Sequence, residues 1–378
     1  MGGTARAALD TCAGLVTHGV DVSLVSTAAS GDDLSHLKGE YADVPSRVFD
    51  RRFPRHNFRS PSLRRWLDAN VAHFDLVEIH GVFSLVPLYA SRACRRARTP
   101  YTVRPHGSLD PFDLQKHTLA KKVLGPTLFR SVLEGAASLV LTSQSEADRV
   151  VTFGTNPRKS ILPLPVPPPR ERGDGAGFRA QHGIPSDASV VLLLGRIHPK
   201  KGLQFLLPSL AGLKPSFPNL WFMAVGTGEP AHMAQMNRLL HEHDMVDWST
   251  RCGFATGSAK QSAFAASDVF ALPSLNENFG IAVVEAMYAG LPVLVSDEVY
   301  IHDVVSAEGS GVVCEPSSAS CRPALHRLLA DGGARREMGR RGPETAHRHF
   351  SPERTVAALT KVYDELVTIR DGLVGRHG

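Results

Sequence analysis

The segment LPSLNENFGIAVVEAMYAGLPVL, residues 272–294, carries the clearest structural pattern in the chain. An apolar run ends at Ser274, a polar turn follows, and the pattern then predicts a helix that begins near Gly280 and stops at Gly290. Glycine is favoured just after the end of a helix, and Pro292 beyond it discourages continuation. The segment therefore predicts a strand, a loop and a buried helix in succession.

Short apolar runs of the same kind recur along the whole chain, each separated from the next by a helix-like stretch. Near-continuous apolar strands that alternate with helices indicate parallel sheets covered on both faces. The predicted strands are Val20–Ser26, Phe74–His80, Tyr101–His106, Ser138–Thr142, Ser160–Leu164, Val190–Gly195, Leu220–Gly226, Asp268–Pro273, Pro292–Ser296 and Gly311–Cys314.

The proline-rich segment PLPVPPPRERGDG, residues 163–175, separates the first five strands from the last five. Its prolines favour extended backbone and its glycines end regular structure, so we expect an interdomain linker here. A length of 378 residues suits two domains. We predict an α/β protein of two Rossmann-like domains facing across a cleft. The first comprises residues 1–165, with a C-terminal helix at 352–378 packing back on it, and the second comprises residues 166–351.

Two glutamates in the opening segment are candidates for ligand binding. Glu285 is the one charge in a helix that is otherwise apolar on nearly every side, and a buried carboxylate without a partner is costly. It should therefore face a ligand or a buried cation. Glu277 precedes the helix, where the backbone N–H groups of Phe279, Gly280 and Ile281 would point at an anion. The alternative is a structural helix in which Glu285 caps a neighbouring loop.

Two further loops follow predicted strands of the second half. GRIHPKKG, residues 195–202, places Arg196 and Lys201 between a strand and a helix, where two cations suit a diphosphate. Lys200 is expected to face solvent. Gly226-Thr-Gly228 would let backbone approach a ligand, but the full G-x-G-x-x-G spacing of a dinucleotide site is absent. A solvated basic turn remains the alternative for the first loop.

In the first half, Arg104-Pro-His-Gly107 ends a predicted strand, and His106 is its notable residue. Ligands of open parallel sheets bind at the carboxyl ends of the strands, which favours His106 over most of the 17 histidines. His80-Gly81 has the same form with less support. The bland alternative is a structural histidine.

Several functional classes lack their signatures. The sequence contains no Asp-x-Asp, Walker loop, G-x-S-x-G or H-E-x-x-H, so phosphate charge should be met by side chains and helix ends, with no metal and no cofactor. Five cysteines without a C-x-x-C pair indicate neither a disulfide framework nor a zinc site. No apolar run approaches the ~20 residues of a membrane span, and no signal peptide opens the chain. We therefore expect a cytoplasmic protein.

The net charge of +5 is unevenly distributed. Residues 1–165 hold 21 Lys and Arg against 15 Asp and Glu, and the remaining residues hold 21 against 22. No zinc finger or RNP-type sequence accompanies the basic half, so nucleic acid is not the expected partner. An Arg-rich solvated surface and a peripheral site for an anionic membrane or acceptor both remain open.

The sequence resembles the retaining family 4 glycosyltransferases of GT-B fold, of the type found in bacterial polysaccharide clusters. The resemblance covers nearly the whole chain, and its most specific element is the E-x7-E pair of Glu277 and Glu285. The supporting motifs follow in the family's order: Gly2-Gly3, Pro105–Phe112, Gly195-Arg196 with Lys201-Gly202, Gly226-Thr-Gly228, Gly253, Pro273-Ser274 and Leu294–Val299.

The resemblance implies specific roles. Arg196 and Lys201 would hold the diphosphate of a nucleotide-sugar donor, Glu285 the ribose and Glu277 the donor sugar, with the amides of Phe279–Ile281 near phosphate or sugar. His106 would lie beside the anomeric centre, and Gly3 and Gly226 near the donor. The expected reaction is metal-independent sugar transfer with retention, onto a glycan, a glycolipid or another hydroxyl acceptor.

Two questions stay open at the level of sequence. Family members carry a strand before the glycine-rich loop, in the middle of the first sheet, whereas residues 1–378 start at the loop, so we expect a strand encoded upstream or a sheet lacking it. A sugar-nucleotide epimerase of the same architecture, an inactive donor-binding protein and a small soluble acceptor are the alternatives in function.

Overall fold

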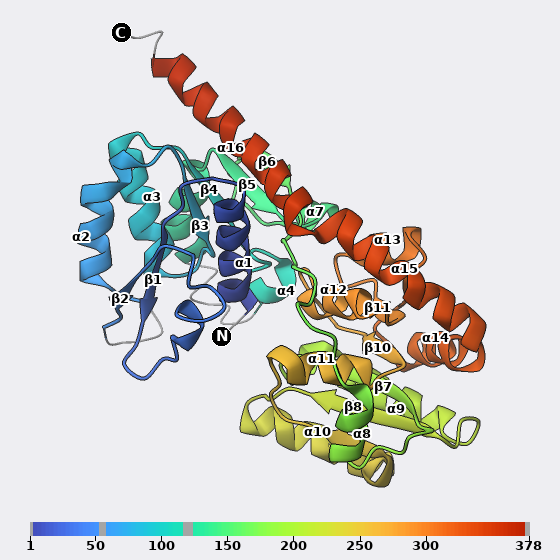
Figure 1. The fold of residues 1–378 in the computed structure, drawn as a ribbon. Coiled ribbons are helices and arrows are strands. Elements are labelled where there is room, and N and C mark those ends of the chain that lie inside the picture. The colour runs from blue at the N-terminus through green and yellow to red at the C-terminus, as the bar shows by residue number, and fades with distance from the viewer. Residues whose placement is uncertain (1–2, 53–57, 116–123, 375–378) are drawn as a thin grey trace. The chain divides into compact units, whose positions relative to one another are not determined.

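The structure, a computed structural model, describes residues 3–52, 58–115 and 124–374. The chain forms two compact units (Figure 1). The first unit comprises Met1–Pro165 together with Pro352–Gly378, and the second comprises Val166–Ser351.

The second unit is built on a six-stranded parallel sheet in the order β12-β11-β10-β7-β8-β9. Its strands are β7 (Ser189–Leu194), β8 (Leu220–Val225), β9 (Ser249–Arg251), β10 (Val269–Leu272), β11 (Val293–Ser296) and β12 (Gly311–Cys314). In chain order, β8 and β9 are added on one side of β7. The next strand, β10, then pairs with the other side of β7, and β11 and β12 continue outward from it. The carboxyl ends of β7 and β10 are therefore the switch point at which open α/β sheets bind ligands.

Helices cover both faces of this sheet. They are α8 (Gly175–Gln181), α9 (Leu203–Leu213), α10 (Pro230–Glu242), α11 (Gly257–Ala265), α12 (Ile281–Tyr288), α13 (His302–Ala307), α14 (Ser318–Ala330) and α15 (Gly332–Phe350). Val191 and Leu193 of β7 pack into one core with α9, α10 and α14, and Val190 and Leu192 are also fully buried. This burial on both faces explains the continuous apolar run of β7.

The first unit contains two parallel sheets (Figure 1). The larger has the order β3-β4-β5-β6, with β3 (Val77–His80), β4 (Tyr101–Arg104), β5 (Ser138–Leu141) and β6 (Lys159–Ile161). The smaller pairs β1 (Leu24–Ala28) with β2 (Ser46–Asp50). Within the described residues, no strand joins β1 to β3. β1–β2 and β3–β6 are therefore two separate sheets.

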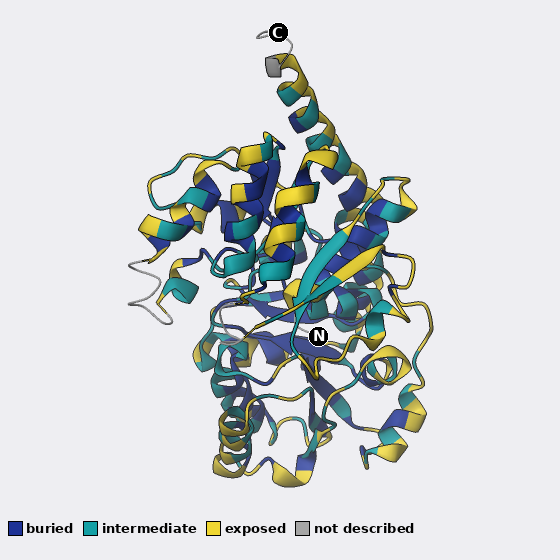
Figure 2. Ribbon diagram, turned by 90° about the vertical axis from the view of Figure 1, so that its left-hand side faces the viewer, coloured by how far each residue is buried: buried dark blue, intermediate teal, exposed yellow. Residues whose placement is uncertain are grey.

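The helices of the first unit surround these sheets. They are α1 (Gly3–Thr17), α2 (Pro61–Asn70), α3 (Leu85–Ala97), α4 (Pro111–Leu114), α6 (Arg130–Glu134), α7 (Gln144–Arg149) and the C-terminal α16 (Pro352–Val374). β4 and β5 are fully buried, whereas every residue of β1 and β2 is partly or fully exposed (Figure 2).

The C-terminal helix α16 belongs to the core of the first unit. Val356 and Leu359 of α16 are buried against Leu15 of α1 and Val140 of β5. The approach to α1 is close, because a side chain at Gly14 would lie 2.5 Å from a methyl carbon of Val356. Glycine at position 14 therefore allows the two helices to pack, and α16 brings residues 352–374 onto a sheet that ends at residue 161.

Candidate active site

Three loops meet at the switch point of the second unit, and they touch through their backbones. A β-carbon at Gly226 would lie 1.9 Å from the carbonyl oxygen of Gly195, and one at Gly228 would lie 2.1 Å from that of Ile197. A β-carbon at Gly202 would lie 1.9 Å from the carbonyl oxygen of Pro273. Only glycine fits at these places, so the predicted motifs 195–202 and 226–228 form one packed edge with the loop after β10.

Hydrogen bonds lock the first of these loops to the third. The backbone N–H of Leu275 donates to the carbonyl of Lys200 at 2.8 Å, and the Lys200 ammonium donates to Oδ1 of Asn276 at 3.0 Å. Our expectation that Lys200 simply faces solvent is therefore wrong. Asn276, which is buried, was not predicted from the sequence because its role appears only when the two loops are brought together.

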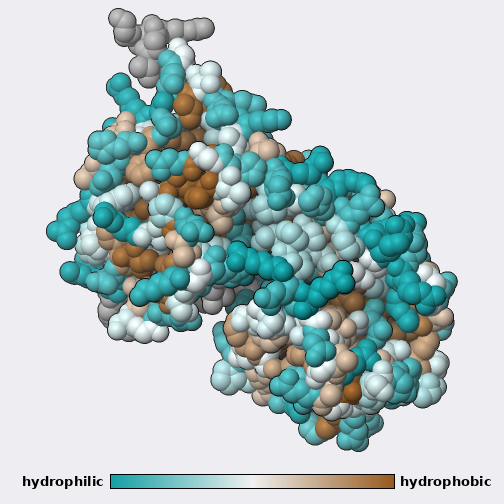
Figure 3. Space-filling model, viewed as in Figure 1, coloured by the Kyte–Doolittle hydropathy of each residue, from teal (hydrophilic) through white to brown (hydrophobic). Residues whose placement is uncertain are grey.

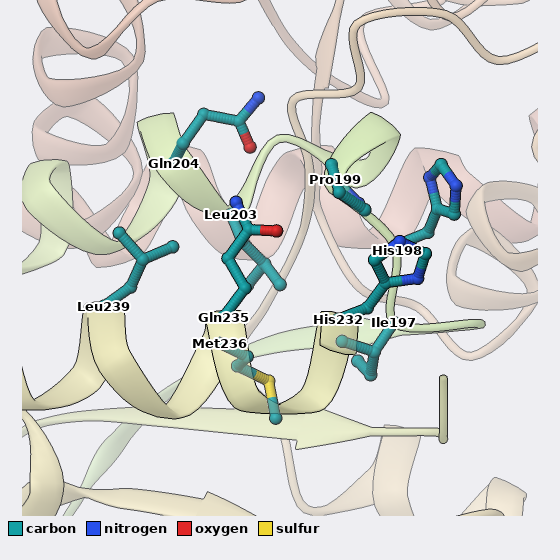
Figure 4. Close-up of a pocket in the computed structure, with 9 residues that line it drawn as sticks. All are labelled: Ile197, His198, Pro199, Leu203, Gln204, His232, Gln235, Met236 and Leu239. Carbon is teal, nitrogen blue, oxygen red and sulfur yellow. The ribbon is translucent and has the colours of Figure 1, made fainter. Parts of the chain in front are cut away.

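Apolar packing against α10 also holds the loop of residues 195–202 in place. Ile197 and Leu203 lie over Met236, and the rings of His198 and His232 meet edge to face with centroids 4.6 Å apart (Figure 4). Nδ1 of His198 also accepts the backbone N–H of Lys200 at 3.1 Å. The backbone that carries Arg196 and Lys201 is thus held on both sides.

The predicted charged residues of the second unit are arranged in pairs. Lys201 forms an ion pair with Glu277, which joins two predicted site residues. Glu285 accepts a hydrogen bond from Lys260 of α11 at 2.5 Å, so of the two partners expected for Glu285, a ligand or a buried cation, the structure shows a cation. Nothing in the sequence pattern singles out Lys260, which lies 25 residues before Glu285.

Arg196 differs from these paired residues. Its side chain is exposed, and none of the described carboxylates forms an ion pair with it. It stands directly after Gly195, whose φ of +144° turns the chain away from β7. Arg196 is thus a cation available to a ligand at this edge.

The start of α12 presents backbone rather than side chains. Gly280, the N-cap residue, has φ +81° and no side chain to cap the first turn. Phe279 is buried and packs edge to face on Phe350, with ring centroids 5.4 Å apart, so its side chain is not available to a ligand. The first N–H groups of α12, with Ile281 at N1, are left to bind an anion from outside the helix. The N–H groups of Val283 and Val284 already donate to the carbonyl of Gly280, and the anion-binding role of residues 279–281 stays a prediction.

The first unit places His106 immediately beyond β4 in a strained backbone conformation. His106 has φ +52° and Gly107 has φ +73°, in the region that residues with a β-carbon seldom adopt. Glu146 holds this turn, because its Oε1 accepts the N–H of Gly107 at 2.9 Å and its Oε2 accepts the N–H of Thr142 at 2.7 Å. Strain retained at a strand end in this way is typical of functional sites.

A series of close contacts between side chains leads from His106 into the sheet. Nε2 of His106 lies 2.8 Å from Nδ1 of His80, and Nε2 of His80 lies 3.2 Å from Oε1 of Glu78. The structure thus joins His106 to His80, the weaker candidate of the sequence. Glu78 was not predicted.

Two more residues surround the Glu78 carboxylate. Arg104, with 1 % of its side chain exposed, donates through Nε to Glu78 at 2.9 Å and through Nη1 to the carbonyl of Leu162 at 3.2 Å. Tyr363 of α16 donates its hydroxyl to the other oxygen of Glu78. The Glu78 side chain itself is 10 % exposed.

Electrostatics in this cluster favour a charged glutamate and neutral histidines. Loss of solvent is the largest single influence on Glu78 and acts to raise its pKa, but the charges of Arg104 and His80 and the hydrogen bonds from Tyr363 and Arg104 together bring the pKa below its ordinary value. Desolvation lowers the pKa of His80, and it holds the pKa of His106 well below its ordinary range, with His80 and Arg104 acting in the same direction. Both rings are therefore neutral around pH 7.

The predicted glycines near the N-terminus are placed in part. Gly3 is the exposed first residue of α1, at the N-terminal end of that helix. Gly2 lies outside the described residues. Clusters of three or more metal-binding side chains are absent from the described ranges, and none of the described helices has the length and apolar character that a bilayer span requires.

Comparison with protein families assigns both units. Residues 176–345 match the family described as Glycosyl transferases group 1, and residues 1–168 match Glycosyltransferase Family 4. The chain belongs to the family 4 glycosyltransferases. Its fold is GT-B, with two Rossmann-like domains, as the sequence predicted.

The curated relatives of this glycosyltransferase include two kinds of inositol-related enzymes. It is 29% identical over 274 residues to a D-inositol 3-phosphate glycosyltransferase of Streptomyces bingchenggensis, covering 68% of this chain and 59% of that protein. It is 30% identical over 189 residues to the phosphatidyl-myo-inositol mannosyltransferase of Mycobacterium leprae, covering 49% of each. The chain thus spans less than two thirds of the length of these relatives.

Solved structures resemble it along almost its whole length. Anabaena Alr3699/HepE, in complex with UDP and glucose, has a TM-score of 0.78 at 18% identity and covers 96% of each chain. The sucrose-phosphate synthase of Thermosynechococcus elongatus has a TM-score of 0.75 at 20% identity, covering 97% of this chain and 94% of that one.

Proposed function

We propose that this protein transfers a sugar from a nucleotide-diphosphate sugar to an acceptor hydroxyl, with retention of configuration and without a metal ion. The observation that carries the proposal is the convergence of Arg196, Lys201 and the uncapped start of α12 at the switch point of the second unit. Two cations and a helix N-terminus at one sheet edge suit a diphosphate.

The ion pairs define how a donor would be held. Arg196 is available to phosphate oxygens at once, whereas Lys201 would exchange its contact with Glu277 for a phosphate oxygen. Glu277 would then be released to accept hydroxyl groups of the donor sugar. Lys260 occupies Oε1 of Glu285, which leaves Oε2 as an acceptor for a ribose hydroxyl. Bound UDP and glucose in the HepE structure are in keeping with this class of donor.

The proposed mechanism requires no nucleophile from the protein. The acceptor hydroxyl attacks on the face from which the nucleotide diphosphate departs, and a departing phosphate oxygen takes the hydroxyl proton. Catalysis is then mainly stabilisation of the leaving charge by Arg196, Lys201 and the α12 amides, where one fixed donor is worth ~3 kcal/mol. His106, neutral at the end of β4, would contact the sugar.

The sequence contains no Asp-x-Asp motif, and we therefore expect sugar transfer to need no metal ion. We expect transfer rates in excess chelator to stay within about twofold of those in untreated enzyme. Loss of most activity in chelator, with recovery on addition of manganese, would contradict this part of the proposal.

For the acceptor we propose a negatively charged glycan, glycolipid or polyol on the cytoplasmic face of the membrane, approached by the first unit. That unit carries the basic excess, and its surface mixes hydrophilic and apolar side chains on the face seen in Figure 3. The names of the curated relatives include acceptors built on inositol phosphate and phosphatidylinositol. A small soluble inositol phosphate is the alternative, and parallel assays with soluble and vesicle-bound acceptors separate the two.

Measurements of donor binding test the proposed diphosphate site directly. Thermal shifts with UDP, GDP, ADP and dTDP sugars should single out one nucleotide, since a ligand at 100 times its Kd stabilises the folded state by about 2.7 kcal/mol. Arg196→Ala should remove the shift, and Arg238→Ala, an exposed arginine on α10, should not. No shift with any of the four nucleotides, or an equal shift in both variants, would contradict the proposed donor site.

A further inference from the structure

Two hydrogen-bond donors hold the Glu78 carboxylate in the first unit. Arg104 and Tyr363 both donate to it, and it is ionised, as the adjacent guanidinium requires. An ionised carboxylate accepts hydrogen bonds and cannot donate them. Nε2 of His80 lies 3.2 Å from Oε1 of Glu78, and a lone pair on that nitrogen would face the negative oxygen, so this contact favours the proton on Nε2 of His80.

The protonation of His80 determines that of His106. A neutral imidazole carries a proton on one nitrogen only, so Nδ1 of His80 is an acceptor. Nε2 of His106 lies 2.8 Å from that acceptor and must donate its proton. His106 is neutral as well, so its Nδ1 carries a lone pair, and no described side chain or backbone group donates to this atom.

The orientation of the two rings supports a hydrogen bond rather than stacking. The ring planes are inclined by only 20°, and their centroids are 5.1 Å apart. The nitrogen–nitrogen distance of 2.8 Å is shorter than the ~3.5–4.0 Å at which stacked faces touch. The rings therefore meet edge to edge in nearly one plane, as an N–H···N bond requires.

We propose that Glu78 and His80 are positioning residues that fix His106 as the Nε2–H tautomer, so that Nδ1 of His106 accepts a hydrogen bond from a hydroxyl group of the bound substrate. The identity of that substrate as a sugar rests on the function proposed above. The tautomer itself follows from the contacts within the first unit. Arg104 and Tyr363 support this arrangement because they keep the Glu78 carboxylate charged and fixed in orientation.

This arrangement assigns His106 a defined chemical task. A neutral ring that offers a lone pair cannot protonate the leaving group, so His106 acts by binding and orienting a hydroxyl. Without His80, either nitrogen of His106 could carry the proton, and the acceptor at Nδ1 would be lost in part of the molecules. Partners that orient metal-binding histidines are worth on the order of 10–100-fold in affinity or activity, and we expect an effect of that order for His80.

Nitrogen NMR of the full chain, labelled with ¹⁵N-histidine, tests the tautomer directly. We expect a scalar coupling across the hydrogen bond between Nδ1 of His80 and Nε2 of His106 at neutral pH. We also expect Nδ1 of His106 to show the shift of a non-protonated ring nitrogen. A proton on Nδ1 of His106, or the lack of any coupling, would overturn the inference whether or not the protein transfers sugar.

Variants at position 80 test the effect on the substrate. His80→Phe should lower kcat by about 10–100-fold with unchanged affinity for the nucleotide diphosphate, which binds in the second unit. His80→Asn keeps an acceptor oxygen and should recover part of kcat. His73→Asn, at an exposed histidine of the same unit, is the matched control and should behave as wild type.

The outcomes distinguish this inference from the proposed function. A wild-type kcat in His80→Phe, or a loss in His80→Asn as large as in His80→Phe, overturns the positioning role. Failure of the wild-type chain to transfer from every donor would instead overturn the proposed function, and the NMR result would still decide the tautomer of His106.

Discussion

Most of the charged side chains at the edge of the second unit form ion pairs with one another. A ligand that binds there would therefore replace these ion pairs. Lys201 and Glu277 neutralise each other, and Lys260 neutralises Glu285. Only about a fifth of the Lys201 and Glu277 side chains is exposed, so the pair should open only when a ligand supplies new partners for both charges. Arg196 alone among these predicted residues offers its charge without such an exchange.

The two glutamates should therefore contribute differently to the reaction. Glu285→Gln should weaken donor and free nucleotide diphosphate alike, raising KM more than it lowers kcat, because the ribose changes little in the transition state. Glu277→Gln should lower kcat by about a hundredfold, equivalent to ~3 kcal/mol, with nucleotide affinity near that of wild type. Calorimetry with the nucleotide diphosphate and initial rates measure both quantities.

The reverse pattern would show that these roles are exchanged. If neither variant changes binding or rate, α12 is a structural helix and the donor lies elsewhere. Glu242→Gln, at an exposed glutamate of α10, serves as the control for a change of charge in the same unit.

At the scale of elements, burial decided which strands the sequence could predict. The buried strands β4, β5, β7 and β10 were predicted within about two residues, because their apolar runs are unbroken. β2 and β9 were missed, since their sequences SRVFD and STR have no unbroken apolar run and none of their residues is fully buried. The helix predicted at 280–290 is α12, and the positive φ of Gly290 confirms the expected stop.

The candidate site was predictable only where its residues share one segment or one strand end. Glu277 and Arg196 stand in local patterns, and His106 follows a strand. Glu78 and Tyr363 are separated by 285 residues, and no local pattern relates a strand residue to a tyrosine on a distant helix. The fold of α16 onto the first unit creates that contact.

The tyrosine on α16 should be worth a measurable part of the stability of the first unit. Tyr363→Phe removes a hydrogen-bond donor from the ionised Glu78 carboxylate, and such bonds contribute about 1.5–3 kcal/mol. Chemical denaturation should show a loss of that size. Thr368→Ala, on the exposed face of the same helix, should change stability by no more than about 0.5 kcal/mol. Equal losses in the two variants would mean that Tyr363 contributes through packing of the helix alone.

At the scale of the whole molecule, the neutral histidines make stability depend on pH. The folded-state pKa values of His80 and His106 lie below the ordinary value of 6.5, so below that pH the unfolded chain binds more protons. The free energy of unfolding then rises with pH and falls as pH is lowered, by up to about 1.4 kcal/mol per pH unit for each histidine. Denaturation between pH 7 and 5 should show this fall.

The control for that measurement depends on whether the charged groups beside His80 and His106 titrate in the same pH range. Glu78 stays charged through this range, since its pKa lies below its ordinary value of 4.5. His106→Gln should therefore flatten the dependence, whereas His73→Asn should retain it. If His106→Gln leaves the pH dependence of the free energy of unfolding unchanged, the His106 ring is not buried in its neutral form.

The uneven charge predicts salt-dependent binding to anionic vesicles. The excess of basic residues lies in the first unit, and exposed charges are screened beyond ~8–10 Å at physiological ionic strength. Sedimentation with phosphatidylserine-containing vesicles should therefore be strong at low salt and fall as salt rises, with no binding to neutral vesicles. Lack of binding at low salt would favour the small soluble acceptor.

The central claim is that the protein moves a sugar from a nucleotide-diphosphate donor to an acceptor hydroxyl. Its most direct test is to incubate the full chain with the donor selected by thermal shift and a panel of inositol phosphate and glycolipid acceptors, and to identify products by mass spectrometry and NMR. We predict a new glycoside of retained anomeric configuration, formed in step with released nucleotide diphosphate and abolished by Arg196→Ala. Conversion of the donor into its epimer without a new glycoside, or a bound donor that stays intact with every acceptor, would contradict it.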